Sequence, residues 1–88
     1  MSGIMRLVID VQKPINLPSV VLAMELSKTK GVEAVDLQIE EVEHRVESAK
    51  VLIEGDNIDM DKIKAVIEKI GASIQGIDRI SCGKRRIG

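Results

Sequence analysis

The chain of 88 residues contains no phenylalanine, tyrosine or tryptophan, and it has a single cysteine, Cys82. RNA-recognition domains stack bases on aromatic side chains of a four-stranded sheet, so the sequence excludes this mode of binding. One cysteine excludes a disulfide within the chain, and it also excludes the paired thiolates that hold Cu(I) or Zn(II) in soft-metal chaperones. The core must therefore be aliphatic, built chiefly from isoleucine and valine, which favour sheet surfaces.

The chain also has little net charge and no long apolar run. Thirteen basic residues oppose fourteen acidic ones, which gives a net charge of −1. This balance provides no general attraction to nucleic acid or to an anionic membrane. No stretch approaches the eighteen or more apolar residues of a membrane span, and the first residues lack the apolar segment of a signal peptide. We expect a cytoplasmic protein that binds neither membrane nor nucleic acid.

Hydrophobic periodicity predicts four strands and two helices. Apolar and polar residues alternate over 4–12, 32–42, 46–54 and 73–81, which is typical of half-buried strands. A first helix is predicted from Pro18 to about residue 29, with Pro18 as its first residue and Gly31 as its stop. A second is predicted from the N-cap Asp59 to Gly71, because apolar residues recur there at helical spacing. Residues 43–45 and 55–57 are predicted turns.

This element order predicts one α+β domain over residues 1–88, with residues 83–88 as a basic C-terminal tail. Strand, helix and strand occur twice in succession, which is the split βαβ arrangement. Right-handed crossovers place both helices on one face of a four-stranded antiparallel sheet with strand order 4-1-3-2. The predicted fold is therefore ferredoxin-like, β-α-β-β-α-β, with one face of the sheet open.

Several segments resemble a known family. They are 6–14 (RLVIDVQKP), 25–28 (ELSK) with 31–33 (GVE), 53–55 (IEG), and the ending 77–85. Together they make the chain similar to the small archaeal proteins grouped as domain of unknown function two-eleven. The resemblance spans essentially the whole chain. It implies a ferredoxin-like fold, ring-like homo-oligomers and no established activity.

The parts needed for catalysis are missing, so we expect that the chain is not an enzyme. His44 is the only histidine, and it falls at a predicted hairpin tip with no serine or cysteine that the sequence places beside it. Acylphosphatase chemistry needs a phosphate-cradling loop with a fixed arginine after the first strand. Residues 12–18 contain two prolines, no glycine and no basic residue except Lys13.

One positive feature is a set of carboxylates on the open face of the predicted sheet. By alternation the set comprises Asp10, Asp36, Glu40 and Glu54. Hard cations such as Ca²⁺ or Mg²⁺ prefer oxygen ligands from several carboxylates, and a ring could bring copies of one carboxylate together. No spacing in the chain matches a calcium loop, so a solvated sheet face is the alternative interpretation.

A second feature is the apolar excess of the first helix. Its residues Val20, Val21 and Met24 lie beyond the stripe that can face the sheet, and such surface commonly marks a protein contact. Deeper burial of this helix is the alternative. A further hypothesis joins the acidic arm around the predicted tip to the tail of a neighbouring subunit, through Lys84, Arg85 and Arg86.

These observations predict a non-catalytic homo-oligomeric module that binds a divalent cation or another small ligand between subunits. The partner is the chain itself, in a ring-like assembly. The alternative is a regulatory domain for an amino-acid-type effector, similar to the amino-acid-sensing ferredoxin-like domains. Its site would lie at about residues 13–19, at the end of the first strand and the start of the first helix.

Overall fold

The computed structural model describes residues 3–85 and residue 87. Its element order is strand, helix, strand, strand, helix, strand, as predicted. The elements are β1 (Gly3–Pro14), α1 (Ser19–Ser27), β2 (Val32–Glu43), β3 (Val46–Ile58), α2 (Met60–Lys69) and β4 (Ser73–Gly83).

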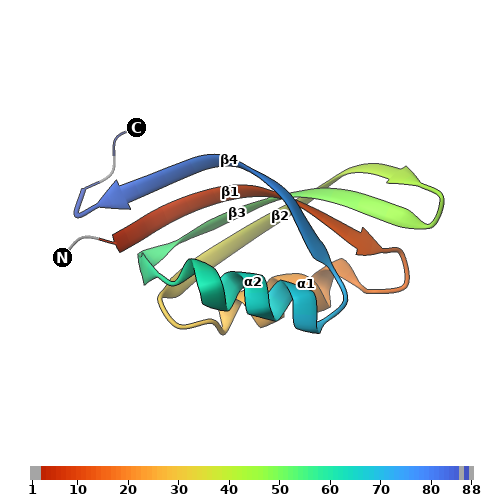
Figure 1. Cartoon of the computed structure of the whole chain (residues 1–88), viewed down its shortest axis with the longest axis horizontal. Coiled ribbons are helices and arrows are strands. Elements are labelled where there is room, and N and C mark those ends of the chain that lie inside the picture. Colours follow the sequence, from red (N-terminus) through yellow and green to blue (C-terminus); the bar gives the residue numbers. More distant parts are fainter. Residues whose placement is uncertain (1–2, 86, 88) are drawn as a thin grey trace.

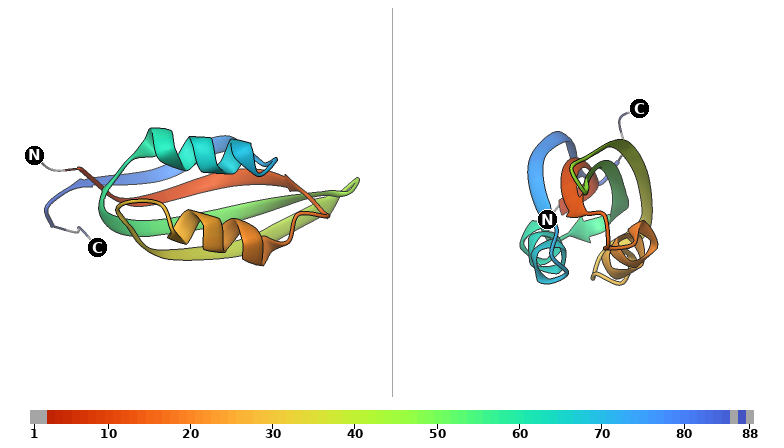
Figure 2. Two further views of the ribbon diagram at one scale, coloured as in Figure 1. Left: turned by 90° about the horizontal axis from the view of Figure 1, so that it is seen from below. Right: turned by 90° about the vertical axis from the view of Figure 1, so that its right-hand side faces the viewer.

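The four strands form one antiparallel sheet in the order β2-β3-β1-β4, which is the predicted order 4-1-3-2 read in reverse. Both helices lie on the same face of this sheet (Figures 1 and 2). On this face, α1 packs near β2 and α2 packs near β4, so each helix covers one half of the face. Among the described residues, no helix lies on the opposite face, which is the polar face of the sheet (Figure 2).

The core lies between the helices and the sheet, and it is entirely aliphatic. Alternate residues of the two central strands point into it and are buried, as the period of two predicted. Each helix contributes two fully buried side chains one turn apart, which face the same surface of the sheet. The most buried members are Leu7, Ile9, Val51, Ile53, Leu22, Leu26, Ile63 and Ile67.

The two helices begin differently. Asp59 caps α2, because its carboxylate accepts the N–H groups of Asp61 at 3.0 Å and Lys62 at 3.4 Å. Helix α1 has no side-chain cap. Pro18, which was predicted as the first helical residue, occupies the N-cap position, so the helix begins one residue later than predicted, at Ser19. The carbonyl oxygen of Pro18 accepts hydrogen bonds from the first turn.

Residues 55–57 belong to β3, so the predicted turn at this place is wrong. The strand continues because Gly55 pairs with Val32 of β2, and a Cβ on Gly55 would lie only 1.9 Å from the carbonyl oxygen of Gly31. The same oxygen accepts the N–H of Asp56 at 2.8 Å. Gly55 is therefore needed because the backbone of Gly31 lies so close to it, and not because the chain turns there.

The hairpin between β2 and β3 extends beyond the helices as an arm (Figure 1). Its tip is formed by His44 and Arg45, whose φ angles of +51° and +66° indicate a two-residue type I′ turn. The predicted tip at 43–45 is confirmed to within one residue. The start of β1 and the end of β4 lie at the other end of the molecule (Figure 1). The long axis of the molecule measures 42 Å.

Candidate functional site

Charged side chains pair across the polar face of the sheet. Arg6 of β1 lies opposite Glu54 of β3, and the Nε of Arg6 donates to the carboxylate of Glu54 at 3.0 Å. Four residues further along β1, on the same face, Asp10 lies opposite Lys50, with 3.0 Å between the carboxylate and the ammonium group. The face therefore carries ordered ion pairs across the central strands.

Lys50 also binds a third residue, Asp78 of β4. The pairing of β1 with β4 shifts between Val8 and Ile9, so that Asp78 is left out of the ladder. Such a bulge re-aims a side chain, and here the carboxylate of Asp78 reaches the polar face beside Asp10. The ammonium group of Lys50 donates hydrogen bonds to Asp78 and Asp10, which raise the pKa of Lys50 above its ordinary value, and the bond that Asp78 accepts from Lys50 lowers the pKa of Asp78.

The predicted metal ligands are only partly brought together. The register places Asp10, Asp36 and Glu54 on the polar face, but Asp10 and Glu54 are already held by basic side chains. Glu40 lies where the pairing of β2 with β3 shifts, so simple alternation does not fix its direction. Within the part of the chain that the structure describes, no three acidic, histidine or cysteine side chains form a group that could hold a metal ion.

Alternation along each strand could not identify Asp78 or Lys50 as partners of Asp10. A bulge changes which face a residue occupies, and the local signal for it is Gly76, because an isolated glycine inside a strand often marks a bulge. The pairing of Lys50 with Asp10 depends on the register between β1 and β3, which a hairpin turn does not determine because these strands are not adjacent in sequence.

The three apolar residues predicted to lie on the flank of α1 are exposed. Val20 is 66% exposed, Val21 40% and Met24 54%, whereas Leu22 and Leu26 of the same helix are fully buried. These three residues are called the α1 flank below. Of the predicted basic contacts, Lys84 and Arg85 are exposed, and Arg86 lies outside the described residues.

Exposed apolar side chains also occur on both edge strands, which the sequence analysis did not identify. On β2, Ile39 and Val42 are exposed, although alternation placed Ile39 among the inward residues. On β4, Ile77 and Ile80 are each 50% exposed. Both pairs occupy the helix-facing side of the sheet, because they lie opposite inward-facing positions of the neighbouring strands. An edge strand has a neighbouring strand on one side only, so its side chains are covered on that side and exposed on the other.

The loop between β1 and α1 contains a buried ion pair. Lys13 is 1% exposed, and its ammonium group binds Glu47 of β3 and the carbonyl oxygen of Leu17 at 2.6 Å. Its positive charge is thus turned inward and neutralised. The loop itself is tied to the arm, because the N–H of Ile15 donates to the carbonyl oxygen of Arg45 at 2.9 Å.

The lone histidine and cysteine are both exposed, at the tip of the arm and near the end of β4 respectively. Neither helix among the described residues is long and apolar enough to cross a membrane.

Two comparisons place the chain among known proteins. The profile of the DUF211 family, described as "Uncharacterized ArCR", matches residues 5–88. The chain is also similar to Uncharacterized protein MJ0319 of the archaeon Methanocaldococcus jannaschii, with 36% identity over 87 residues. That alignment covers 99% of this chain and 90% of the relative. The chain therefore belongs to the DUF211 family, the domain of unknown function two-eleven.

Proposed function

We propose that the chain is a non-catalytic module of ferredoxin-like fold that works by self-association. In this proposal the β2 edge and the α1 flank of one copy contact the β4 edge of the next. The observation that carries the proposal is the exposed apolar surface of α1, since a helix that lies on the surface of a monomer normally turns a polar face to water.

Both edges of the sheet are suited to such a contact. In the part of the chain that the structure describes, β2 pairs only with β3 and β4 only with β1, so each presents unpaired backbone groups along its outer side. Each edge also presents exposed apolar residues, Ile39 and Val42 on one and Ile77 and Ile80 on the other. Contact between the two edges would remove both the unpaired backbone groups and the exposed apolar side chains from water.

The charges of the two edges are complementary. Strand β2 contains five acidic residues and no basic residue. Strand β4 and the residues after it carry Arg79, Lys84 and Arg85 against one acidic residue, Asp78. Because the edges lie on opposite sides of one sheet, a molecule does not satisfy its own β2 edge with its own β4 edge. Contacts between unlike surfaces are heterologous, and they close into rings when the rotation permits.

A shared ligand fits this arrangement best at the β2 edge. Asp10 and Glu54 lie on the central strands and are already ion-paired, whereas Asp36 and Glu40 lie on the outermost strand and make no ion pair among the described residues. A divalent cation such as Ca²⁺ or Mg²⁺ held between subunits would use Asp36 and Glu40 with oxygen atoms of the neighbouring copy.

The proposal is tested by the mass of the protein in solution. Light scattering should give a multiple of 9.6 kDa at micromolar concentration, with concentration read by refractive index because the chain has no aromatic residue. The variant Val20→Ser, Val21→Ser, Met24→Gln should lower this mass by disrupting the α1 flank. The matched control Ala65→Ser, on the exposed side of α2, should leave it unchanged.

Charge complementarity is tested in the same assay by deleting residues 84–88. The truncated protein should dissociate more readily than the full chain, and the difference should be larger at low salt, because screening removes the attraction between exposed charges. A strictly monomeric wild-type protein at micromolar concentration would rule out the proposal.

A further inference from the structure

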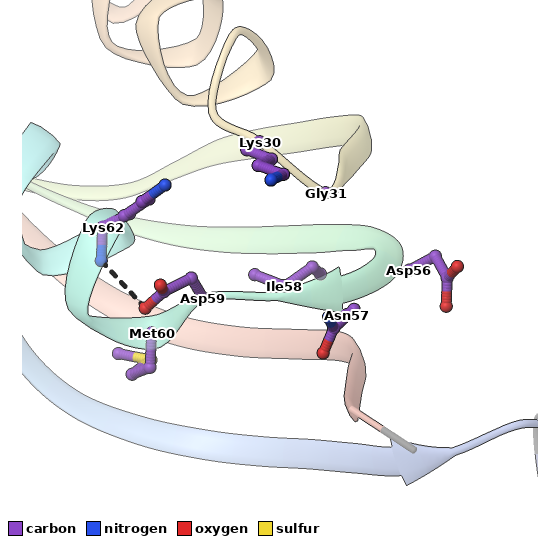
Figure 3. A pocket seen from close by; sticks show the side chains of 8 residues that line it. All are labelled: Lys30, Gly31, Asp56, Asn57, Ile58, Asp59, Met60 and Lys62. Atoms are coloured by element: carbon purple, nitrogen blue, oxygen red, sulfur yellow. Dashed lines mark hydrogen bonds between the residues drawn. The ribbon is translucent and has the colours of Figure 1, made fainter. Parts of the chain in front are cut away.

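A hollow of about 490 Å³ lies beside the turn between α1 and β2 (Figure 3), at the end of the molecule opposite the arm (Figure 1). One wall is the turn between α1 and β2, and the other is the end of β3 with the first turn of α2. Its volume falls within the range of small-ligand sites. The lining residues are Lys30, Gly31, Asp56, Asn57, Ile58, Asp59, Met60 and Lys62.

The backbone holds the two walls of this hollow in place. Gly31 has a φ of +92°, and a Cβ there would lie 2.8 Å from the carbonyl oxygen of Asp56. Asn57 on the facing wall also has a positive φ, of +54°. The N–H of Asp56 donates to the carbonyl oxygen of Gly31 at 2.8 Å. The walls are therefore joined by direct backbone contact, and the hollow is formed without a ligand.

Two lysine side chains approach the hollow from opposite walls. Lys30 comes from the α1–β2 turn and Lys62 from the first turn of α2, and both side chains extend into the space between the walls (Figure 3). Neither ammonium group makes an ion pair with any described residue, unlike Lys13, Lys28 and Lys50. These two charges are free for an anionic group.

A carboxylate with spare bonding capacity lines the same hollow. Asp59 uses Oδ1 for both of its bonds to the helix N–H groups, and its Oδ2 makes no hydrogen bond to the described residues. The buried side chain of Ile58, the last residue of β3, belongs to the same wall as Asp59 (Figure 3). The site thus offers positive charge and negative charge beside an apolar residue.

A second hollow, of about 350 Å³, is also lined by both lysines. It runs between the end of α1 and the first half of α2, where Thr29, Ala65 and Val66 provide methyl groups. A ligand whose charged group sits between Lys30 and Lys62 therefore has room for an uncharged extension on the other side of the lysines.

We infer that this pair of hollows binds a small zwitterion with the head group of a free α-amino acid. Its carboxylate lies between Lys30 and Lys62, its ammonium group binds Oδ2 of Asp59, and its side chain extends towards Ala65 and Val66. A phosphate group fits less well, because Asp59 already occupies the positive end of α2 and Asp56 adds a second negative charge to the lining. This inference does not depend on self-association.

The site differs from the location that the sequence favoured for an amino-acid-type effector. At that location, residues 13–19, the charge of Lys13 is buried and bound to Glu47. The free lysines lie at the opposite end of the molecule. An effector that needs a cationic partner for its carboxylate finds one at Lys30 and Lys62.

Isothermal titration calorimetry of the full chain tests the inference, with the twenty standard amino acids and inorganic phosphate as probes. At least one amino acid should bind, and its N-acetyl derivative should bind less tightly. Lys30→Ala and Lys62→Ala should each weaken binding by about tenfold or more, because each removes a charge-assisted bond. The control Lys64→Ala lies on the same helix but lines a different hollow, beside β4, and should bind like wild type.

A second variant separates binding from folding. Asp59→Asn keeps a good N-cap, so circular dichroism should show an unchanged helix, while the binding of the amino acid should weaken. The inference is overturned if no amino acid binds, if phosphate binds in its place, or if the lysine variants bind as tightly as wild type.

Discussion

The two halves of the chain have the same order of elements, but their helices are built on different principles. Helix α2 contains the features of an independent surface helix, namely the N-cap Asp59, Asp61 in its first turn and Lys69 in its last. Helix α1 has no side-chain cap and no charged residue of the favourable sign in its first or last turn. The comparison indicates that the ends of α2 are stabilised by residues of α2 and its own cap, whereas α1 depends on contacts with other parts of the fold.

The approach to α1 illustrates this dependence. The residue just before Pro18 is Leu17, whose carbonyl oxygen accepts a hydrogen bond from buried Lys13, and Lys13 is held by Glu47 of β3. The start of α1 is thus fixed by an ion pair anchored in the sheet. The start of α2 is fixed by its own residue Asp59, two or three positions from the N–H groups that it binds.

The largest effect should come from breaking the ion pair. Glu47→Ala leaves the ammonium group of Lys13 buried without its counter-charge, which typically costs about 3 kcal/mol or more. Urea unfolding monitored by circular dichroism would measure the loss. Because the arm and the loop share this contact, the loss should also appear as faster amide exchange at Ile15 and Leu17.

The matched control removes both charges. Lys13→Met with Glu47→Leu replaces the buried pair by apolar side chains of similar size, and such replacements are often close to neutral. A double variant as unstable as Glu47→Ala would show that the charges themselves, rather than the orphaned lysine, determine the stability.

A smaller effect is expected at the other helix. Asp59→Ala removes the cap of α2 and should cost about 1 kcal/mol, the usual value for such a change. The same urea experiment measures it, with Asp56→Ala as a control in which the helix keeps its cap. If Asp59→Ala proved as costly as Glu47→Ala, the proposed contrast between the two helices would be wrong.

The smallest effect concerns Asp78 on the polar face. Its bond to Lys50 lowers its pKa below the ordinary value of 3.8, so the bond stabilises the fold above that pH. The stabilisation should be lost as the pH falls through the lowered pKa. Asp78→Asn should therefore reduce stability slightly at neutral pH and make no difference in strong acid, as thermal unfolding at a series of pH values would show.

The fold was largely predictable because its elements follow simple periods. Alternation located all four strands, and the stripe of Ile63 and Ile67 with the cap at Asp59 located α2. Errors arose where backbone geometry overrides composition. Gly55 and Asn57 are typical turn residues, yet they extend β3, since close contact with Gly31 requires a glycine there.

The candidate site was less predictable because it depends on register between strands distant in sequence. Asp10 and Glu54 were correctly placed on one face, but their basic partners follow from the pairing of β1 with β3. Asp78 reaches that face through a bulge, and the shift near Glu40 removes this residue from simple alternation. The burial of Lys13 was equally hidden, since lysine is almost never buried without a partner and Glu47 is far away in sequence.

The contact between Gly31 and Gly55 limits how this chain can change by mutation. With no side chain on either residue, the backbone that leads into β2 lies directly on the end of β3. An added methyl group at Gly55 would collide with main-chain atoms, which have no alternative rotamer to adopt. Substitution at either glycine therefore requires a simultaneous shift of the opposing strand, so these two positions are expected to tolerate almost no single replacement even though neither bears a functional group.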